Sequence, residues 1–484
     1  MEVLFPQIDY RLMAPVFAVT ATGLFALLLD LVVGRDKNHL LAYISILGLG
    51  IALLLTLNIW GEEASILNGM VLVDGFSNFF NLVFIIITAL SILISIRYIR
   101  EMGINYGEYY VLMVFSTLGM MGMAQAGDLL MVFLGIELLS IPIYILAGFL
   151  KRDVRSNESA MKYFLLGAFS AAFLLYGIAL IYGATGTTNI RGVEEFIESQ
   201  GAMGNPFLVL GMGLMIVGLG FKVALVPFHM WTPDAYEGAP VAVTAFMSVG
   251  PKAAGFAAFL RLLLSAVEAL RPDWVILLWI LAVLTMTVGN IIAYAQTNIK
   301  RMLAYSSIAH AGYILVGLVA GDELGAAAIL FYTLVYALMN LGAFGIIILL
   351  GGAGRERATL SDFTGLASAH PLAAAAMGLF LLSLTGVPPT AGFVGKFYLF
   401  SSAVKTGFIW LAVIAVVNSA ISVYYYLRVI VLMYMQSGRE VARPLMLSPS
   451  LVIALAITAV GTLGMGIFPS YFLALASESI KAIM

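Results

Sequence analysis

Four ionisable side chains lie deep inside apolar stretches of this 484-residue chain: Glu137, Lys222, Lys252 and Lys396. They occur in the segments FLGIELLSIPIY, GLGFKVALVPFHMW, SVGPKAAGF and GVPPTAGFVGKFYLF. A charge at the centre of a lipid bilayer costs on the order of 3 kcal/mol by insertion scales. Four such charges are therefore tolerated only if they face one another or a hydrated interior.

The chemistry open to this set is proton transfer. Three lysines cannot all be neutralised by one carboxylate, and burial favours the neutral form of a lysine. At least one lysine is therefore expected to release its proton readily, which is what a relay requires. The competing interpretation is structural, with each lysine reaching the membrane edge or held in a fixed ion pair. The unbalanced set of charges favours the relay.

Prolines lie close to these charges. Pro227 follows Lys222 by five residues, and Pro388 and Pro389 precede Lys396. A proline inside a helix removes one hydrogen bond and displaces the carbonyl four residues earlier. The carbonyls freed in this way are those of Val223, Leu384 and Thr385. Such groups are tolerated in a membrane where they are buried in protein or line water, so we expect helix breaks beside an ion path.

His310, in YSSIAHAGY, lies about a third of the way along another apolar stretch. Imidazole ordinarily titrates near neutrality, so this residue is suited to pass protons between the charges. The alternative is a histidine bonded to a backbone carbonyl or to Ser306 or Ser307. Nearby hydroxyl groups, including Tyr305 and Thr333, are expected to hold water between the charges.

Two acidic residues, Asp234 and Glu237 in WTPDAYEGAP, are expected to have no lysine nearby. We expect them on the inner side of the membrane. Two interpretations remain open, an entrance for protons and a solvated loop.

The composition indicates a polytopic membrane protein. The chain is 62% hydrophobic and 10% charged, with a mean hydropathy of +1.04, whereas an ordinary globular protein is roughly 25% charged. A net charge of −2 gives no reason to expect nucleic acid as a partner. No cysteine and four histidines leave too few ligands for an iron–sulfur cluster. Haem is disfavoured because three of the histidines fall in loops or near membrane edges: His39, His229 and His370.

Apolar runs of about 20 residues, each long enough to cross a bilayer, predict about fourteen membrane-spanning helices. They cover 12–33, 40–60, 76–97, 109–126, 129–150, 161–183, 206–227, 240–265, 273–296, 301–320, 324–350, 371–403, 408–434 and 447–475. The seventh and the twelfth are expected to be broken. The longest loop, 184–205, is expected to contain a short interfacial helix.

The distribution of lysine and arginine predicts the orientation. With both termini outside, fifteen of these residues fall on the inner side and six on the outer side. The inner set is Arg35, Lys37, Arg97, Arg100, Lys151, Arg152, Arg155, Lys162, Lys300, Arg301, Arg355, Arg357, Arg428, Arg439 and Arg443. The outer set is Arg11, Arg191, Arg261, Arg271, Lys405 and Lys481. This asymmetry also supports the count of fourteen helices, because one miscounted helix would disrupt the alternation of sides.

Four segments together resemble the antiporter-like membrane subunits of respiratory complex I: FLGIELLSIPIY, GFKVALVPFHMWTPDAYEGAP, IKRMLAYSSIAHAGY and GVPPTAGFVGKFYLF. The resemblance extends from about residue 70 to 440. Two features narrow it to one type of subunit. Lys396 occupies a position at which a second type of these antiporter-like subunits has glutamate. The chain also ends soon after the fourteenth predicted span, whereas a third type of subunit has a long lateral helix.

The resemblance implies an all-α fold of fourteen core helices with two inverted five-helix repeats and discontinuous helices 7 and 12. The chain is then a single membrane domain over 1–484. It divides into N-terminal helices 1–3 (1–105), the first repeat with helices 4–8 (106–265), the second repeat with helices 9–13 (266–434) and helix 14 (435–484).

The resemblance also assigns roles. Glu137 and Lys222 would form the charge pair of the first half-channel, and Lys252 would be the central relay lysine. Lys396 would serve the exit half-channel, and His310 falls in a stretch that the family shares. The chain would carry out proton translocation, driven by quinone reduction elsewhere.

The implied surroundings follow from the same resemblance. No cofactor is expected on this chain, and NADH, FMN, iron–sulfur clusters and quinone are expected in other subunits. The expected partners are lipids and the neighbouring membrane-arm subunits M, K and J. The expected location is the bacterial plasma (inner) membrane, which we favour over a thylakoid.

Three alternatives remain open on the sequence. The first is a subunit of a multi-subunit cation/proton antiporter, built on the same fold and charges. The second is a relative linked to a membrane-bound hydrogenase or to ferredoxin or F420. The third is a structural membrane subunit in which the charges hold helices together.

Overall fold

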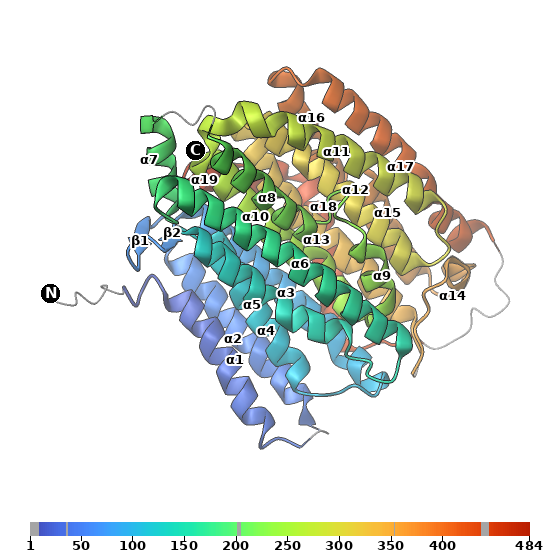
Figure 1. Cartoon of the computed structure of the whole chain (residues 1–484). Helices are drawn as coiled ribbons and strands as arrows, with labels where there is room; N and C mark the ends of the chain where they lie inside the picture. The colour runs from blue at the N-terminus through green and yellow to red at the C-terminus, as the bar shows by residue number, and fades with distance from the viewer. Residues whose placement is uncertain (1–8, 35–36, 201–204, 353, 437–444) are drawn as a thin grey trace.

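The apolar runs of the sequence form helices, because a helix in lipid satisfies its own backbone hydrogen bonds. The computed structural model describes residues 9–34, 37–200, 205–352, 354–436 and 445–484. Figure 1 shows the helices side by side in one bundle, in which the last helices of the chain pack back against its N-terminal part.

The N-terminal segment contributes three long helices and a short hairpin. Its helices are α1 (Ala14–Asp30), α2 (His39–Asn58) and α3 (Gly75–Glu101). Asp74 begins α3 by accepting a hydrogen bond from the Ser77 amide at 2.7 Å, and the Ser77 hydroxyl accepts one from the Asp74 amide at 3.0 Å. This reciprocal cap satisfies two amides that a helix start leaves unpaired.

The hairpin is a difference from the all-α expectation. Strands β1 (Ala64–Ile66) and β2 (Val71–Val73) pair antiparallel. The turn between them places Leu67, Asn68 and Gly69 at positive φ. Asn-Gly between apolar residues favours such a turn, so the sequence carried a local signal for it.

The segment predicted as the first repeat contains α4 (Glu108–Ala124), α5 (Leu129–Ala147), α6 (Val154–Thr185), α7 (Ile190–Gln200), α8 (Pro206–Lys222), α9 (Trp231–Gly238) and α10 (Val241–Arg261). A π-helical turn (Leu262–Ala266) and a 3₁₀ turn (Glu268–Leu270) follow. The helix α7 lies in the loop for which a short helix is predicted.

The segment predicted as the second repeat contains α11 (Arg271–Tyr294), α12 (Ile299–Ala320), α13 (Glu323–Leu350), a 3₁₀ turn (Leu360–Phe363), α14 (Leu366–Ala369), α15 (Pro371–Thr385), α16 (Ala391–Lys405) and α17 (Ile409–Met435). The chain closes with α18 (Pro449–Ile467) and α19 (Pro469–Ile480). The predicted last span is therefore interrupted at Phe468.

Both positions predicted as helix breaks are interruptions in the structure. The chain leaves the helix after Lys222 and resumes it at Trp231, and it leaves again after Thr385 and resumes at Ala391. The Val226–Pro227 and Pro388–Pro389 peptide bonds are cis. Each break thus falls within one segment of the predicted pair.

Ten of the described helices are long and apolar enough to cross a membrane, and α1, α8 and α15 are shorter apolar helices. Fourteen spans and the inverted relation of the two segments stay predictions. The apolar windows of α10 and α12 are 100% buried inside the protein, so these helices form the centre of the bundle. Residues on them are shielded from lipid.

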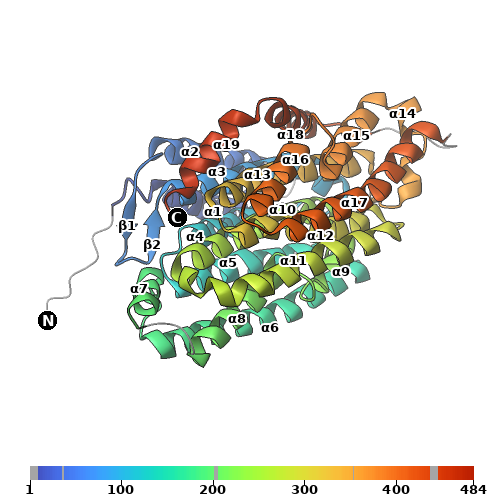
Figure 2. The same cartoon turned by 90° about the horizontal axis from the view of Figure 1, so that it is seen from above.

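The two ends of the bundle differ, as Figures 1 and 2 both show. The hairpin, α7 and α19 lie at one end, and α9 and α14 lie at the other. Helix α1 begins, and α19 ends, at the hairpin end. Which end faces the outside stays a prediction. Three of the basic residues on which this prediction depends, Arg35, Arg439 and Arg443, lie outside the described residues.

Candidate functional site

Lys222 is the last residue of α8 and is 4% exposed. Its Nζ donates to the Ser140 hydroxyl of α5 at 2.6 Å and, more weakly, to the Tyr163 hydroxyl of α6 at 3.4 Å. The rings of Tyr144 and Tyr163 lie 5.9 and 5.5 Å from the Nζ. The ammonium group is therefore held by neutral oxygens and aromatic faces.

The break after Lys222 is stabilised by side chains from other elements. The Trp231 indole N–H of α9 donates to the Phe221 carbonyl at 3.0 Å, and the Thr285 hydroxyl of α11 accepts from the Val226 amide at 3.0 Å. Trp231 also stacks on Tyr163, with ring centroids 4.1 Å apart and planes 3° apart. The break thus supports the ring whose hydroxyl contacts the lysine.

Glu137 is half-buried on α5, one turn before Ser140. In the part of the chain that the structure describes, no ion pair joins it to Lys222, whose contacts go to Ser140 and Tyr163. The two charges are nevertheless close enough to interact electrostatically. The expected ion pair between Glu137 and Lys222 is therefore not formed in this structure.

Lys252 lies in the middle of α10 and is 3% exposed. Its Nζ donates to the Ser307 carbonyl and to the Ser307 hydroxyl, the latter at 2.5 Å. The ring of Tyr336 lies 5.6 Å away. The Tyr236 hydroxyl of α9 is 3.5 Å from the same Ser307 hydroxyl. Ser307 therefore joins the central lysine to the short helix after the first break.

His310, one turn further along α12 and 1% exposed, is bonded on both sides. Its Nδ1 is 2.6 Å from the Tyr332 hydroxyl and its Nε2 is 3.1 Å from the Tyr426 hydroxyl. The Tyr426 hydroxyl also bonds to Ser306. The expected serine partner thus reaches the histidine through a tyrosine, which the sequence did not single out.

Lys396 is on α16, across the second break, and is 4% exposed. Its Nζ donates to the Leu384 and Thr385 carbonyls at 3.0 and 2.9 Å and to the Ser419 hydroxyl at 3.0 Å. These are the carbonyls that Pro388 and Pro389 free from the helix. A lysine at the C-terminal end of α15 also complements the negative end of its dipole.

Polar side chains continue from Lys396 into the bundle. Its Nζ lies 4.7 Å from the centre of the Tyr313 ring. The Tyr313 hydroxyl accepts from Asn290 at 2.9 Å, and Asn290 accepts from Tyr425 at 2.9 Å. On its other side, Lys396 lines a cavity of about 880 Å³ between α16 and α17 whose remaining walls are mostly apolar.

The acidic residues Asp234 and Glu237 are neither isolated nor far from lysine. Asp234 pairs with Lys162 of α6 at 2.6 Å and with Arg301 of α12 at 2.7 Å, and Glu237 pairs with Arg301 at 3.0 Å. The expectation that no lysine lies nearby was wrong, because Lys162 is distant only in sequence. Partial burial acts to raise the pKa of Asp234, but hydrogen bonds from Lys162 and Arg301 hold it below its ordinary value.

Two further buried cations were assigned to the membrane edges by the sequence. Arg261, 2% exposed, makes two hydrogen bonds to Asp74 at 2.6 and 3.1 Å. Lys300, 1% exposed, pairs with Glu356 at 2.8 Å. Their carboxylate partners lie far away in sequence, so no local pattern could have identified the pairs. Arg261 and Lys300 are thus held by carboxylates. Among the described residues, Lys222, Lys252 and Lys396 are not.

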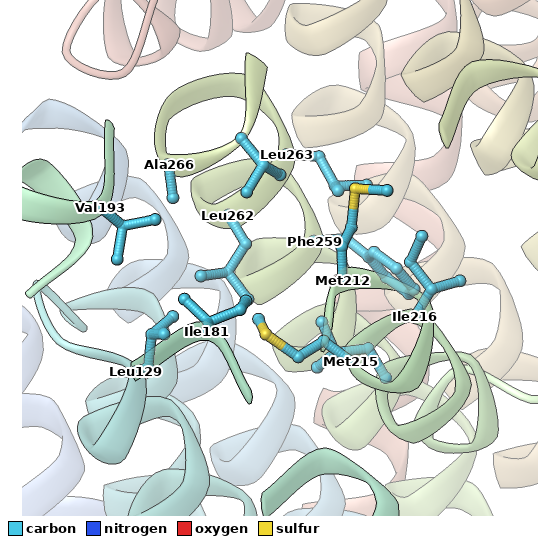
Figure 3. A pocket seen from close by; sticks show the side chains of 12 residues that line it. Leu129, Ile181, Val193, Met212, Met215, Ile216, Phe259, Leu262, Leu263 and Ala266 are labelled. Atoms are coloured by element: carbon cyan, nitrogen blue, oxygen red, sulfur yellow. The ribbon is translucent and has the colours of Figure 1, made fainter. Parts of the chain in front are cut away.

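A small apolar gap lies between α5, α6, α7, α8 and α10 (Figure 3). Leu129, Ile181, Val193, Met212 and Phe259 point into it from five different helices. Its walls are entirely apolar and its volume is about 10 Å³, which is at most room for one water. Neither property suits a cofactor. Among the described residues, no three metal-ligating side chains converge.

Residues 126–422 match the sequence model of a family described as NADH:quinone oxidoreductase/Mrp antiporter, transmembrane. The chain is 51% identical to NADH-quinone oxidoreductase subunit N of Trichlorobacter lovleyi, over 99% of both chains. It is 46% identical to the subunit of the same name from Chloroflexus aggregans, over 99% of this chain and 98% of that one.

Solved structures are similar along nearly the whole chain. A chain of respiratory complex I from Thermus thermophilus with bound aureothin is 36% identical, with a TM-score of 0.80, covering 96% of this chain and 99% of that chain. A chain of the archaeal membrane-bound sulfane sulfur reductase is 26% identical, with a TM-score of 0.84 over 98% and 97%. A chain of the Mrp complex from Dietzia sp. is 22% identical, with a TM-score of 0.84 over 98% and 100%, which is a likeness of fold.

Proposed function

The chain belongs to the NADH:quinone oxidoreductase/Mrp antiporter transmembrane family, and we propose that it is the subunit-N component of a proton-translocating NADH–quinone oxidoreductase. It works in the membrane arm of respiratory complex I, with Glu137, Lys222, Lys252, His310 and Lys396 as its proton relay. The full-length relatives named above share this subunit name, which supports that choice within the family.

The observation that carries the relay is the kind of partner each buried cation has. Lys222, Lys252 and Lys396 donate to hydroxyls and carbonyls, which are neutral. Arg261 and Lys300, at similar burial, are matched by carboxylates. A buried cation without an opposite charge is poorly stabilised, so it exchanges its proton more easily than a paired one.

The first step lies at the first break. Glu137 approaches Lys222 in one state and stabilises its positive charge. A conformational signal from a neighbouring subunit separates them, as in the arrangement described above, and Lys222 then gives up its proton. At roughly 4 Å, such a pair is worth about 4 kcal/mol at an effective dielectric of 20, which is enough to change the protonation state of the lysine.

The next steps cross the centre of the bundle. Ser307 accepts from Lys252, and its neighbour Ser306 bonds to Tyr426, which bonds to His310. The proton passes between these two hydrogen-bonded groups, which meet at the adjacent residues Ser306 and Ser307 of α12. Lys396, at the second break, delivers the proton to the outer side.

The remaining parts of the proposal concern the surroundings. This chain carries translocation and has no redox site of its own, while NADH, FMN, iron–sulfur clusters and quinone belong to other subunits. Subunits M, K and J are its neighbours. It resides in the bacterial inner membrane with both termini outside, and its segments 106–265 and 266–434 are inverted repeats within fourteen spans.

Proton translocation in inside-out membrane vesicles driven by NADH tests the proposal. Lys222→Ala and Lys252→Ala are compared with wild type and with Lys151→Ala, an exposed lysine. We expect both buried-lysine variants to oxidise NADH with fewer protons moved per electron, and the control to behave as wild type.

Assembly of the complex is measured on the same vesicles. An unchanged proton-to-electron ratio in assembled Lys222→Ala and Lys252→Ala complexes would rule out the relay. If alanine prevents assembly, Lys→Arg variants keep the charge but titrate at a higher pH, so they should assemble and still pump less. Proton exchange against sodium without any electron donor would instead identify an antiporter.

A further inference from the structure

A basic cavity lies at the end of the bundle opposite the hairpin, away from the buried lysines. Its volume is about 390 Å³, and it is enclosed by the start of α2, the end of α3 and the start of α18. Its walls are His39, Tyr43, Ile96, Arg97, Arg100, Glu101, Asn105, Ser448, Pro449 and Ser450. The function proposed above makes no use of it.

The charges on its walls favour an anion. Arg97 is 3.3 Å from Glu101 and also donates to the Leu447 carbonyl. The Arg100 side chain is exposed and has neither an ion pair nor a hydrogen bond within the described part of the chain. Two guanidinium groups and one imidazole thus face a single carboxylate. Arg100 is left available for an external partner.

The start of α18 adds to this field. Ser448 caps the helix by accepting from the Leu451 amide at 3.3 Å, and its hydroxyl is 3.2 Å from that of Ser450. Pro449 is the first helical residue of a 19-residue helix. The positive end of that helix and its unpaired amides therefore point toward the same cavity.

An apolar strip leads away from the cavity along α3. The partly exposed positions of this otherwise buried helix are Leu82, Ile86, Ala89, Leu93 and Ile96, and they end at Arg97 and Arg100. Their spacing of three and four residues places them on one face. Helices α2 and α18 both pack against α3, and the strip on α3 forms an apolar track that ends at the cavity.

The two helices that pack against α3 expose apolar side chains of their own. Leu47 and Leu54 of α2 are 66% and 67% exposed, and Ile453 and Val460 of α18 are 51% and 70% exposed. A soluble anion needs no such surface. A cationic cavity at the membrane edge that continues into an apolar track matches a molecule with an anionic head and long hydrocarbon chains.

We propose that this cavity binds the phosphate headgroup of an anionic phospholipid, with its acyl chains lying along α3. Arg97, Arg100 and the start of α18 hold the phosphate, because a guanidinium fork matches phosphate oxygens in both charge and geometry. Basic pockets between membrane helices on the cytoplasmic side bind anionic lipids in this way. The lipid joins α2 and α18 to the edge of α3.

The experiment measures hydrogen–deuterium exchange at the starts of α2 and α18 in the purified, delipidated complex. Phosphatidylglycerol, phosphatidylcholine and inorganic phosphate are titrated separately. We expect phosphatidylglycerol to slow exchange at both sites and the other two to have no effect at equal concentration. Arg100→Ala should need about fivefold more phosphatidylglycerol for half of this protection, the effect of one basic residue near a membrane surface.

Two further variants complete the test. Arg152→Ala removes another exposed arginine and should titrate like wild type, and Arg100→Lys, which keeps the charge and loses the guanidinium fork, should fall between wild type and Arg100→Ala. Equal protection by inorganic phosphate would overturn the lipid assignment in favour of a free anion. Equal protection by phosphatidylcholine, or an Arg100→Ala titration identical to wild type, would overturn the site.

Discussion

Replacing a buried lysine should have a different consequence from replacing a buried arginine, although both are cations inside the bundle. Arg261 makes two hydrogen bonds to Asp74 and one to the Ala124 carbonyl at 2.8 Å. Arg261→Met leaves Asp74 buried without its opposite charge. Removing one partner of a buried ion pair costs about 3–5 kcal/mol.

Lys252→Met has a smaller expected cost. It removes two hydrogen bonds to Ser307 and keeps an apolar side chain of similar length, while the Tyr236 hydroxyl remains 3.5 Å from the Ser307 hydroxyl. An unsatisfied neutral group costs about 1–3 kcal/mol. The two variants should therefore differ by about 2 kcal/mol, which is more than tenfold in an equilibrium constant.

The temperature of half-inactivation of the purified complex and the amount of assembled chain in membranes measure this difference. Lys252→Met should assemble and lose proton pumping, whereas Arg261→Met should assemble poorly. Lys300→Met also leaves a carboxylate, Glu356, without its opposite charge. It should therefore assemble as poorly as Arg261→Met. If Lys252→Met destabilises as much as Arg261→Met, Lys252 is a structural pin and the reasoning from neutral partners fails.

Three further outcomes are expected. Trp231→Leu removes the stack on Tyr163 and the bond to the Phe221 carbonyl, so pumping per electron should fall, and Trp231→Phe, which keeps a stacking ring, should recover part of it. Gly255→Ala places a methyl group 2.4 Å from a Val223 side-chain atom; this overpacking should cost about 1–3 kcal/mol, seen as a lower half-inactivation temperature. Partial burial acts to raise the pKa of Asp322, but hydrogen bonds from Ser402, the Gly325 amide and Lys405 hold it below its ordinary value. Its contribution to stability is therefore present above its unfolded pKa and lost as the pH falls through its folded pKa. Protection from hydrogen exchange at the end of α16, taken relative to the intrinsic rate at each pH, should fall below about pH 4, and unchanged protection there would contradict the link.

The sequence by itself determined where the helices and the unusual charges lie. Hydropathy is a local property, so the apolar runs and the lysines inside them could be identified without any partner. Proline chemistry is equally local, and it placed the two breaks beside Lys222 and Lys396. The Asn68–Gly69 turn was also a local signal, although the expectation of an all-α fold left it unused.

The tertiary structure alone decided what each charge faces. Ser140 reaches Lys222 from 82 residues away, and Asp74 reaches Arg261 from 187 residues away. Helix packing brings these partners together, and packing depends on which faces of many helices fit one another at once. A lysine with a neutral partner and an arginine with a carboxylate look alike in a sequence. Only the folded bundle separates a buried cation with neutral partners from one that is held by a carboxylate.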